Sequence, residues 1–315
     1  MPSSAIQKFS DAEEYAASIR GAKIALTIIG RGEFDAEITR INFHRLWMQR
    51  FSENLPRVMH SANATGRAII SFHTQPGPDL VRSGVDVSPN CIAWLGKDHS
   101  YLQRSSGLTN WGAMSLPEED LRDVWLAISD CDLTPRSDEL IVRPLPAAMA
   151  KLQRLHAVAG ELAERQPDIL ANAEVARGLE QALIQSWVAC VDTGDVVEST
   201  AARGRHSAIM QRFHAEIEAH VGEAVYIPEI CRATNASQRM LNMCCHEALG
   251  MGPKRYLLRR RMQLARQALA RAEPARATVT GIATGFGFFD LGRFAVEYRS
   301  LFGEPPSATL RAPAV

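Results

Sequence analysis

The feature that most constrains this 315-residue chain is a pattern that occurs twice near its C-terminus, over residues 226–253 and 279–306. Each copy has a short apolar segment, turn residues, a helix-capping residue, a longer segment of helical period, and then a glycine followed by a proline. Glycine just after the last periodic residue, with proline beyond it, is typical of a helix end. The pattern predicts two copies of a short helix, a sharp turn and a second helix.

The first copy has a clear signal at each position. Asn235 stands at the turn, where a positive φ is often needed and asparagine tolerates it. Ser237 is suited to cap the second helix, Gly250 to end it, and Pro253 to prevent its continuation. The helical period turns Leu241, Cys245 and Leu249 inward and Arg239, Met243 and His246 outward.

The second copy has corresponding signals. Gly287 stands at the turn and Asp290 at the N-cap, and Phe289 is expected to pack on Phe294 as a hydrophobic staple. One face of the second helix carries Phe294, Tyr298, Leu301 and Phe302, and the opposite face carries Gly292, Arg293, Val296 and Arg299.

The glycines of this second copy also suggest a phosphate-binding loop of a nucleotide enzyme. Gly285 and Gly287 begin a G-x-G-x-x-G pattern, but the third glycine, Gly292, falls five residues on, inside the expected helix. No strand precedes the loop, as that pattern requires. The nucleotide-loop interpretation is therefore rejected.

Charge is distributed unevenly along the chain. Residues 201–315 hold about 16 Lys and Arg against about 9 Asp and Glu, whereas residues 1–200 hold about 19 against about 26. A basic segment suits a polyanionic partner, and a helix, turn and helix with an exposed polar face can place its second helix in the DNA major groove. The run Arg259, Arg260 and Arg261 is expected either to meet phosphates or to form a solvated helix face.

Residues 206–310 resemble the double helix-turn-helix domain of the AraC/XylS family of transcription regulators. In the second copy the family pattern falls on Gly287, Phe288, Gly292, Phe294, Tyr298, Phe302, Gly303 and Pro306. In the first copy it falls on Ile230, Ser237, Leu241, Leu249, Gly250, Pro253, Tyr256 and Leu257. The resemblance is most specific over the last 30 residues of this segment.

The resemblance implies which side chains meet DNA. It places Arg239, Asn242 and Met243 of the first copy and Gly292, Arg293 and Val296 of the second against base edges, and His246 and Arg299 near phosphates. Arginine prefers guanine and asparagine prefers adenine, whereas methionine and valine make only apolar contacts. The family often has a polar residue where Met243 stands, so specificity in the first copy is either weak or dependent on Arg239. A helix of about 18 residues between the copies is about 27 Å long, close to the ~34 Å between successive major grooves.

The N-terminal part is expected to be β-rich, then helical. Short β-prone runs separated by turn residues extend over about 22–117, and helical periods follow over about 146–166 and 168–192. A polar stretch then marks a linker. The chain is expected to be α+β overall, with a regulatory and dimerisation domain (1–192), a linker (193–205) and an all-α DNA-binding domain (206–315). In layout the N-terminal part resembles the cupin-like sensor domains of the family, with trailing helices.

The N-terminal domain is expected to bind a small-molecule effector that changes how the DNA units are presented; the alternative is that it serves only to dimerise or to contact polymerase. Candidate pocket residues are Trp47, Arg50, His73, Trp94 and Trp111, although such residues are more often core or rim. The other expected partners are double-stranded promoter DNA, RNA polymerase and a second copy of the chain, joined through helices 146–192. The expected role is that of a transcription factor, more specifically an activator.

Enzymatic function is the main alternative, as a metal-dependent cupin or as a DNA-repair fusion that uses the same DNA-binding unit. His44, His60, His73 and His99 lack the close spacing of a cupin metal site, and the cysteine-rich segment of the repair proteins is missing. The six cysteines follow no metal or disulfide spacing, and neighbours such as Cys244 and Cys245 diverge on a helix. We therefore expect no metal, no cofactor and no catalytic residues, and buried reduced thiols.

No run of eighteen apolar residues occurs, and the N-terminus lacks the basic and apolar segments of a secretory signal. The sequence therefore predicts a cytoplasmic protein without a membrane partner.

Overall fold

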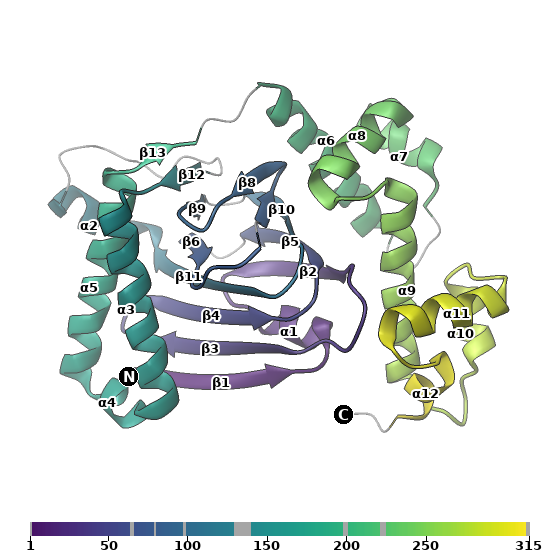
Figure 1. Ribbon diagram of the computed structural model, residues 1–315, viewed down its shortest axis with the longest axis horizontal. Helices are drawn as coiled ribbons and strands as arrows, with labels where there is room; N and C mark the ends of the chain where they lie inside the picture. The colour runs from purple at the N-terminus through teal and green to yellow at the C-terminus, as the bar shows by residue number, and fades with distance from the viewer. Residues whose placement is uncertain are drawn as a thin grey trace.

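A computed structural model describes residues 2–63, 66–78, 80–96, 99–128, 140–197, 201–220 and 225–312. Two β-sheets occupy the middle of the molecule, with helices α3 and α5 on one side and helices α6–α12 on the other (Figure 1). The strands are β1 (Ser3–Phe9), β2 (Ala22–Ile28), β3 (Ala36–Asn42), β4 (Trp47–Glu53), β5 (Arg57–Asn63), β6 (Arg67–His73), β7 (Leu80–Arg82), β8 (Val85–Val87), β9 (Ile92–Leu95), β10 (Ser100–Ser105), β11 (Thr109–Pro117), β12 (Leu140–Arg143) and β13 (Asp195–Val196). The helices of the N-terminal part are α1 (Ala12–Ser18), α2 (Glu118–Ile128), α3 (Pro146–Arg165), α4 (Pro167–Ala171) and α5 (Ala173–Asp192).

The strands form two antiparallel sheets. One has eight strands in the order β1-β3-β4-β11-β6-β9-β12-β13, and the other has five in the order β2-β5-β10-β7-β8. In the larger sheet Trp111 lies opposite Phe51 and His73, while its neighbour Gly112 lies opposite Arg50 and Phe72. Successive side chains of a strand point to opposite faces, so the two sets face the smaller sheet and the helices respectively.

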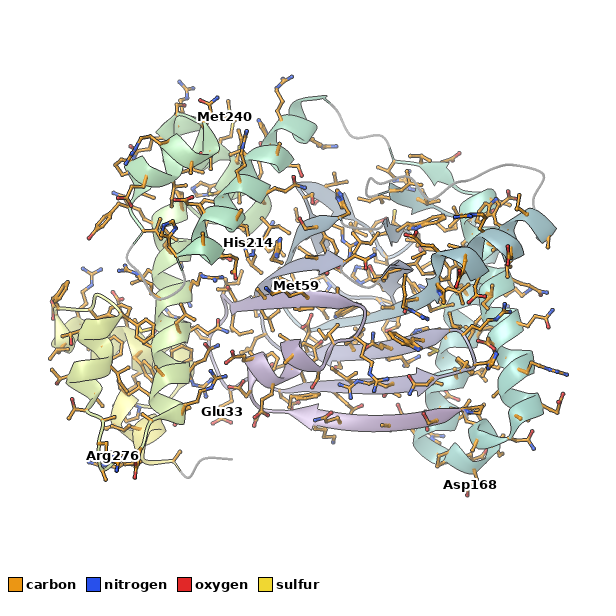
Figure 2. The ribbon with its side chains drawn as sticks, turned by 180° about the vertical axis from the view of Figure 1, so that it is seen from behind. Glu33, Met59, Asp168, His214, Met240 and Arg276 are labelled. Atoms are coloured by element: carbon orange, nitrogen blue, oxygen red, sulfur yellow. The ribbon has the colours of Figure 1, made fainter. Side chains whose placement is uncertain are left out.

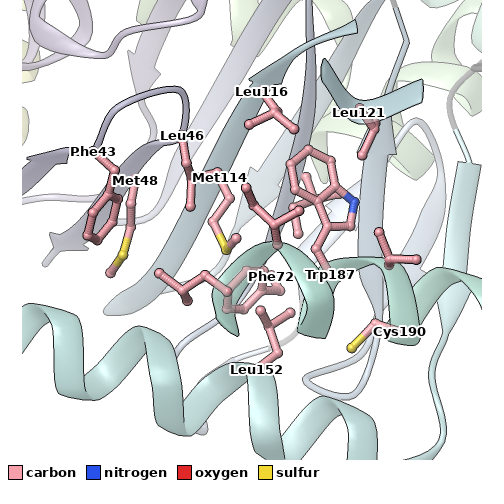
Figure 3. Packing of buried hydrophobic residues seen from close by; sticks show 14 of the residues in the cluster. Phe43, Leu46, Met48, Phe72, Met114, Leu116, Leu121, Leu152, Trp187 and Cys190 are labelled. Atoms are coloured by element: carbon pink, nitrogen blue, oxygen red, sulfur yellow. The ribbon is translucent and has the colours of Figure 1, made fainter. Parts of the chain in front are cut away.

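The largest core lies between the outer face of the larger sheet and the helices (Figure 3). Phe72, Met114 and Leu116 of the sheet pack there with Leu152 of α3 and Trp187 of α5, and all five are buried. A second core, between the sheets, includes Tyr15, Leu26, Phe51, Tyr101 and Trp111. The β-rich part with trailing helices is thus as expected from the sequence.

Two elements of this part differ from the sequence-based expectation. The β region begins at Ser3, earlier than expected, because β1 pairs with β3 along its whole length. The expected helix 168–192 is two helices, since Asn172 leaves the helical conformation and its side chain caps α5 through the N–H groups of Glu174 and Val175.

The C-terminal part is entirely helical. Its elements are α6 (Ala201–Ala219), α7 (Ile227–Thr234), α8 (Gln238–Leu249), α9 (Pro253–Arg271), α10 (Val279–Gly285), α11 (Leu291–Phe302) and α12 (Pro306–Arg311). Helices α7 and α8 form the first helix-turn-helix unit, α10 and α11 form the second, and α9 joins them (Figure 1).

Both turns have the expected geometry. Asn235 and Gly287 adopt left-handed φ values of 52° and 76°. The Ser237 hydroxyl accepts a hydrogen bond from the N–H of Met240 at 3.2 Å, and the Asp290 carboxylate accepts one from the N–H of Arg293 at 3.0 Å. The caps predicted from the sequence are confirmed.

The expected hydrophobic staple is wrong by one residue. Phe288 is the side chain that packs on Phe294, with ring centroids 4.8 Å apart, whereas Phe289 is 82% exposed. After the left-handed Gly287, the N–H of Phe288 donates to the carbonyl of Ala283 at 2.9 Å. This bond folds Phe288 under the turn and leaves Phe289 outside.

The helical part packs against β2, an edge strand of the smaller sheet. The side-chain amide of Gln263 on α9 donates to the Leu26 carbonyl and accepts from the Ile28 N–H, each at 3.0 Å. Arg271 of α9 also pairs with Glu13 of α1 at 2.6 Å, and the Gly32 N–H donates to the Leu301 carbonyl at 3.2 Å. The helical part therefore bonds to the free edge of β2 through the Gln263 side chain, and to the segment after β2 through the Leu301 carbonyl.

Among the described residues, no helix is long and apolar enough to cross a bilayer.

Candidate nucleic-acid interface

Helix α8 presents the first set of candidate base readers. Arg239 and His246 are exposed, Asn242 is half-buried and Met243 is 41% exposed. The opposite face of the helix is held in the core by buried side chains, namely Leu241, Cys244, Cys245, Ala248 and Leu249. The structure therefore brings these four predicted residues to the outer side of α8.

Helix α11 presents the second set. Gly292, Arg293 and Arg299 are exposed, and Val296 is 71% exposed. Phe294 and Tyr298 anchor the other face in the core of the second unit. The Arg293 guanidinium donates from Nε to the Glu297 carboxylate at 2.8 Å, one turn along the helix.

The arginine run of α9 makes contacts within the molecule, so the solvated-face interpretation is wrong, while phosphate contact by these residues stays a prediction. Arg259 is half-buried and donates to the Gly30 carbonyl at 3.5 Å, and Arg260 pairs with Glu218 of α6. The Arg261 guanidinium lies 5.5 Å from the centre of the Phe288 ring. The three cations thus contact three different parts of the molecule, because consecutive residues of a helix point about 100° apart.

The five predicted effector residues do not line one cavity. Only His73 and Trp111 lie together, beside a hollow between the sheets with room for about 10 Å³. Trp94 is in the helix-facing core, and the Arg50 guanidinium lies between the sheet and α3, donating to the His156 carbonyl at 2.9 Å. Trp47 lies under the Arg67 guanidinium, 3.9 Å from the ring centre. Strand alternation separates these residues, and the sequence alone does not show which strands pair.

A polar group between the two sheets was not predicted from the sequence. The buried Arg82 guanidinium donates to Gln103 and Ser71, both at 2.8 Å, and lies 3.8 Å from the centre of the Tyr101 ring. The signal was present, since an arginine at an inward position of the alternating run Leu80–Val87 is unusual. Elsewhere in this interior, Arg57 forms a fully buried ion pair with Glu53.

Two histidines stack where the helical part meets the smaller sheet. The rings of His60 on β5 and His214 on α6 lie 3.6 Å apart. Figure 2 labels His214 of this pair, where the helices meet the sheet. Burial lowers the pKa of His60 to about 4 and that of His214 to about 2, with nearby Arg260 acting in the same direction. The neutral form is therefore favoured at both positions.

The cysteines that the structure describes are free thiols. Burial raises the pKa of Cys244 to about 11 and those of Cys190 and Cys245 to about 12, so these thiols stay protonated and unreactive. Cys131 lies outside the described residues. Within the described ranges, no three His, Cys, Asp or Glu side chains are grouped to hold a metal ion.

Comparison with known proteins finds sequence similarity in the C-terminal part. A family model described as "Helix-turn-helix domain" matches residues 230–312. The probable thc operon regulatory protein of Rhodococcus erythropolis is 42% identical over 95 residues, and the XylDLEGF operon transcriptional activator 3 of Pseudomonas putida is 35% identical over 95. The match covers 30% of this chain and 29% of each of these relatives. The crystal structure of the AraC-like transcriptional activator CuxR aligns over 83% of this chain and 95% of its own, with 15% identity and a TM-score of 0.38.

Proposed function

We propose that this chain, whose residues 230–312 match a helix-turn-helix family model and resemble operon regulators, is a transcription regulator of the AraC/XylS family that binds promoter DNA. The observation that carries the proposal is the repeated geometry of α8 and α11. Each is capped after a left-handed turn, anchored by one apolar face and exposed on the other.

The linker helix sets the spacing of the two readers. Helix α9 has 19 residues and is therefore about 28 Å long. Recognition helices at the two ends of such a rod suit successive major grooves on one side of the duplex, which are ~34 Å apart. One chain would then read a site made of two different parts.

Individual roles follow from side-chain chemistry. Arg239 and Arg293 are proposed to read guanine and Asn242 to read adenine, since these are the pairings their hydrogen-bonding groups allow. Met243, Gly292 and Val296 are proposed to lie against base edges, and His246 and Arg299 against phosphates. Breaking the Arg293–Glu297 pair costs little because Arg293 is exposed.

The N-terminal part is proposed to bind a small-molecule effector between its two sheets. His73 and Trp111, together with Arg82 and Gln103, line the hollow there. The hollow has a volume of about 10 Å³ and holds about one water molecule. An effector could bind there only if the residues on one side of the hollow moved. We expect the short strands β7 and β8 to be the part that moves, because they lie at one edge of the smaller sheet.

Further properties are proposed on the same basis. The chain would form a homodimer through α3 and α5, whose outer faces expose Val158 and Val175. It would act as an activator, in line with the names of its Pseudomonas relatives. We further propose that it is cytoplasmic, contacts RNA polymerase and is not an enzyme. We propose that residues 1–192 form the regulatory and dimerisation domain, 193–205 the linker and 206–315 the DNA-binding domain.

Selection of binding sites from random duplexes by the full chain tests the proposal. Arg239→Ala and Arg293→Ala should each weaken binding to the selected site roughly five- to hundredfold and affect random DNA much less. Arg122→Ala, an exposed arginine on α2, is the control and should change neither. Equal losses on selected and random DNA would contradict the base-reading roles, and failure to select any sequence would contradict the function.

A further inference from the structure

The second unit exposes two large apolar side chains next to its charged residues. Phe289, just before α11, is 82% exposed, and Val296, in the middle of α11, is 71% exposed. No other large apolar side chain in the described part of the chain is as exposed as either. Water contact with such side chains is unfavourable, and these two belong to the same helix-turn-helix unit.

These two side chains take no part in the packing of the core. Phe288 supplies the aromatic contact to Phe294, and the Arg261 guanidinium lies near the Phe288 ring. Val296 lies about opposite the buried face formed by Phe294 and Tyr298, since successive helical residues turn by about 100°. Neither Phe289 nor Val296 belongs to a core cluster.

Charged side chains flank Val296 on α11. Arg293 and Arg299 flank Val296 on the exposed side of α11, while the Asp290 carboxylate is occupied in capping the helix. Arg293 is itself paired with Glu297. The surface of α11 is therefore apolar at its centre with cations beside it, an arrangement that complements a groove lined by phosphates.

We propose that Phe289 and Val296 read the 5-methyl groups of thymine in the major groove, with Phe289 a specificity residue of the second unit. This inference rests on the proposed function. Thymine is the base whose major-groove edge carries an apolar group, and the other edges and the phosphates are polar. Gly292, which has no side chain, lies between the two along the chain and lets α11 approach that edge.

The test replaces each thymine of the selected site, one at a time, with deoxyuridine, which lacks only the methyl group. At one or more positions the parent protein should lose about three- to fivefold in affinity per methyl, the amount that burial of one such group contributes. In Phe289→Ala or Val296→Ala that penalty should disappear, because the methyl has lost its contact. Leu108→Ala, an exposed leucine of the β-rich part, is the control and should retain the penalty.

Two results would overturn the inference. One is a site in which no thymine-to-deoxyuridine change weakens binding, and the other is a penalty that stays unchanged in both Phe289→Ala and Val296→Ala. Both leave the proposed function intact, because they presuppose a selected sequence. Failure to select a sequence at all is a separate result that contradicts the function itself.

Discussion

Gly292 has no neighbour within the protein that requires a glycine. Its φ is not in the left-handed region, and a Cβ there would meet only the Asp290 carboxylate, at an ordinary 3.6 Å. Gly287 is different, because its φ of 76° strains any other residue at the turn. The absence of a side chain at 292 is therefore a property of the exposed face of α11.

Gly292→Ala should separate stability from DNA binding. Alanine in the first turn of α11 is expected to raise the free energy of unfolding by about 0.5–1 kcal/mol. The added methyl should weaken binding to the selected site about tenfold, because it holds α11 away from the base edges. Chemical denaturation and binding titrations measure the two effects.

Gly204→Ala on α6 is the matched control, since a Cβ there meets nothing within 4 Å. It should give the same gain in stability with unchanged DNA binding. Undiminished affinity in Gly292→Ala would show that α11 does not approach DNA at this position.

The local features of this region could be predicted well at the residue scale. Asn235, Ser237 and Asp290 have the backbone and capping roles that their chemistry favours, because those roles depend on neighbours in the sequence. The choice between Phe288 and Phe289 could not be predicted in the same way. It depends on how far the chain rotates after Gly287, and both residues are equally apolar.

At the scale of elements, a buried histidine of α3 contacts the larger sheet. The His156 ring sits over Gly112, where a Cβ would come within 2.5 Å of it, and meets the edge of Phe72 with centroids 5.0 Å apart. Burial, followed by the charge of Arg50, lowers the pKa of His156 to about 3. The contact thus favours the neutral ring.

This contact should make stability depend on pH. The folded-state pKa of His156, about 3, is below the unfolded value of about 6.5, so its contribution is fully present above pH ~6.5 and is lost as the pH falls towards 3. Between pH 6 and 4 the unfolded chain binds one more proton here, a slope of about 1.4 kcal/mol per pH unit. Urea unfolding at a series of pH values should show His156→Gln reducing the slope by about that amount.

His44→Gln, at an exposed position, serves as the control and should leave the slope unchanged. A parent-like slope in His156→Gln would mean that the ring is not held neutral by α3 and the sheet.

Helices α8, α9 and α11 could be predicted because the helical pattern of their sequences is not interrupted. The edge strand β1 was missed because most of its side chains are exposed and give no inward and outward alternation. The pairing order of the strands could not be predicted either. It decides that Trp111 meets His73 while Trp94 faces the helices, and it depends on contacts distant in sequence.

At the scale of the whole molecule, one glutamine couples the two parts. Gln263 satisfies a backbone carbonyl and an N–H on the free edge of β2, as a neighbouring strand would do. Nothing in the sequence around Gln263 distinguishes it from Gln267, because the partner strand lies more than two hundred residues away. Such contacts between domains are beyond sequence reasoning on a single chain.

Gln263→Ala should loosen this coupling. Two hydrogen bonds of about 1 kcal/mol each are lost, so the Ile28 amide should exchange with solvent faster, by roughly one to two orders of magnitude. Hydrogen exchange followed by mass spectrometry over β2 measures the change. Gln267→Ala, one turn further along α9, is the control, and equal protection of β2 in both variants would contradict the coupling.

The engaged arginines of α9 also have a kinetic consequence. Helix α9 carries seven cations and no anion, yet Arg259, Arg260, Arg261, Arg266 and Arg271 all contact groups of the same molecule. Arg260, Arg266 and Arg271 are paired with carboxylates, and charges neutralised in this way add little to the long-range attraction that speeds the encounter with a polyanion. Separation of α9 from the N-terminal part would break the Arg271–Glu13 pair and free that cation. If the chain binds DNA as proposed, such an event would change the rate of its encounter with DNA as well as the presentation of its helices.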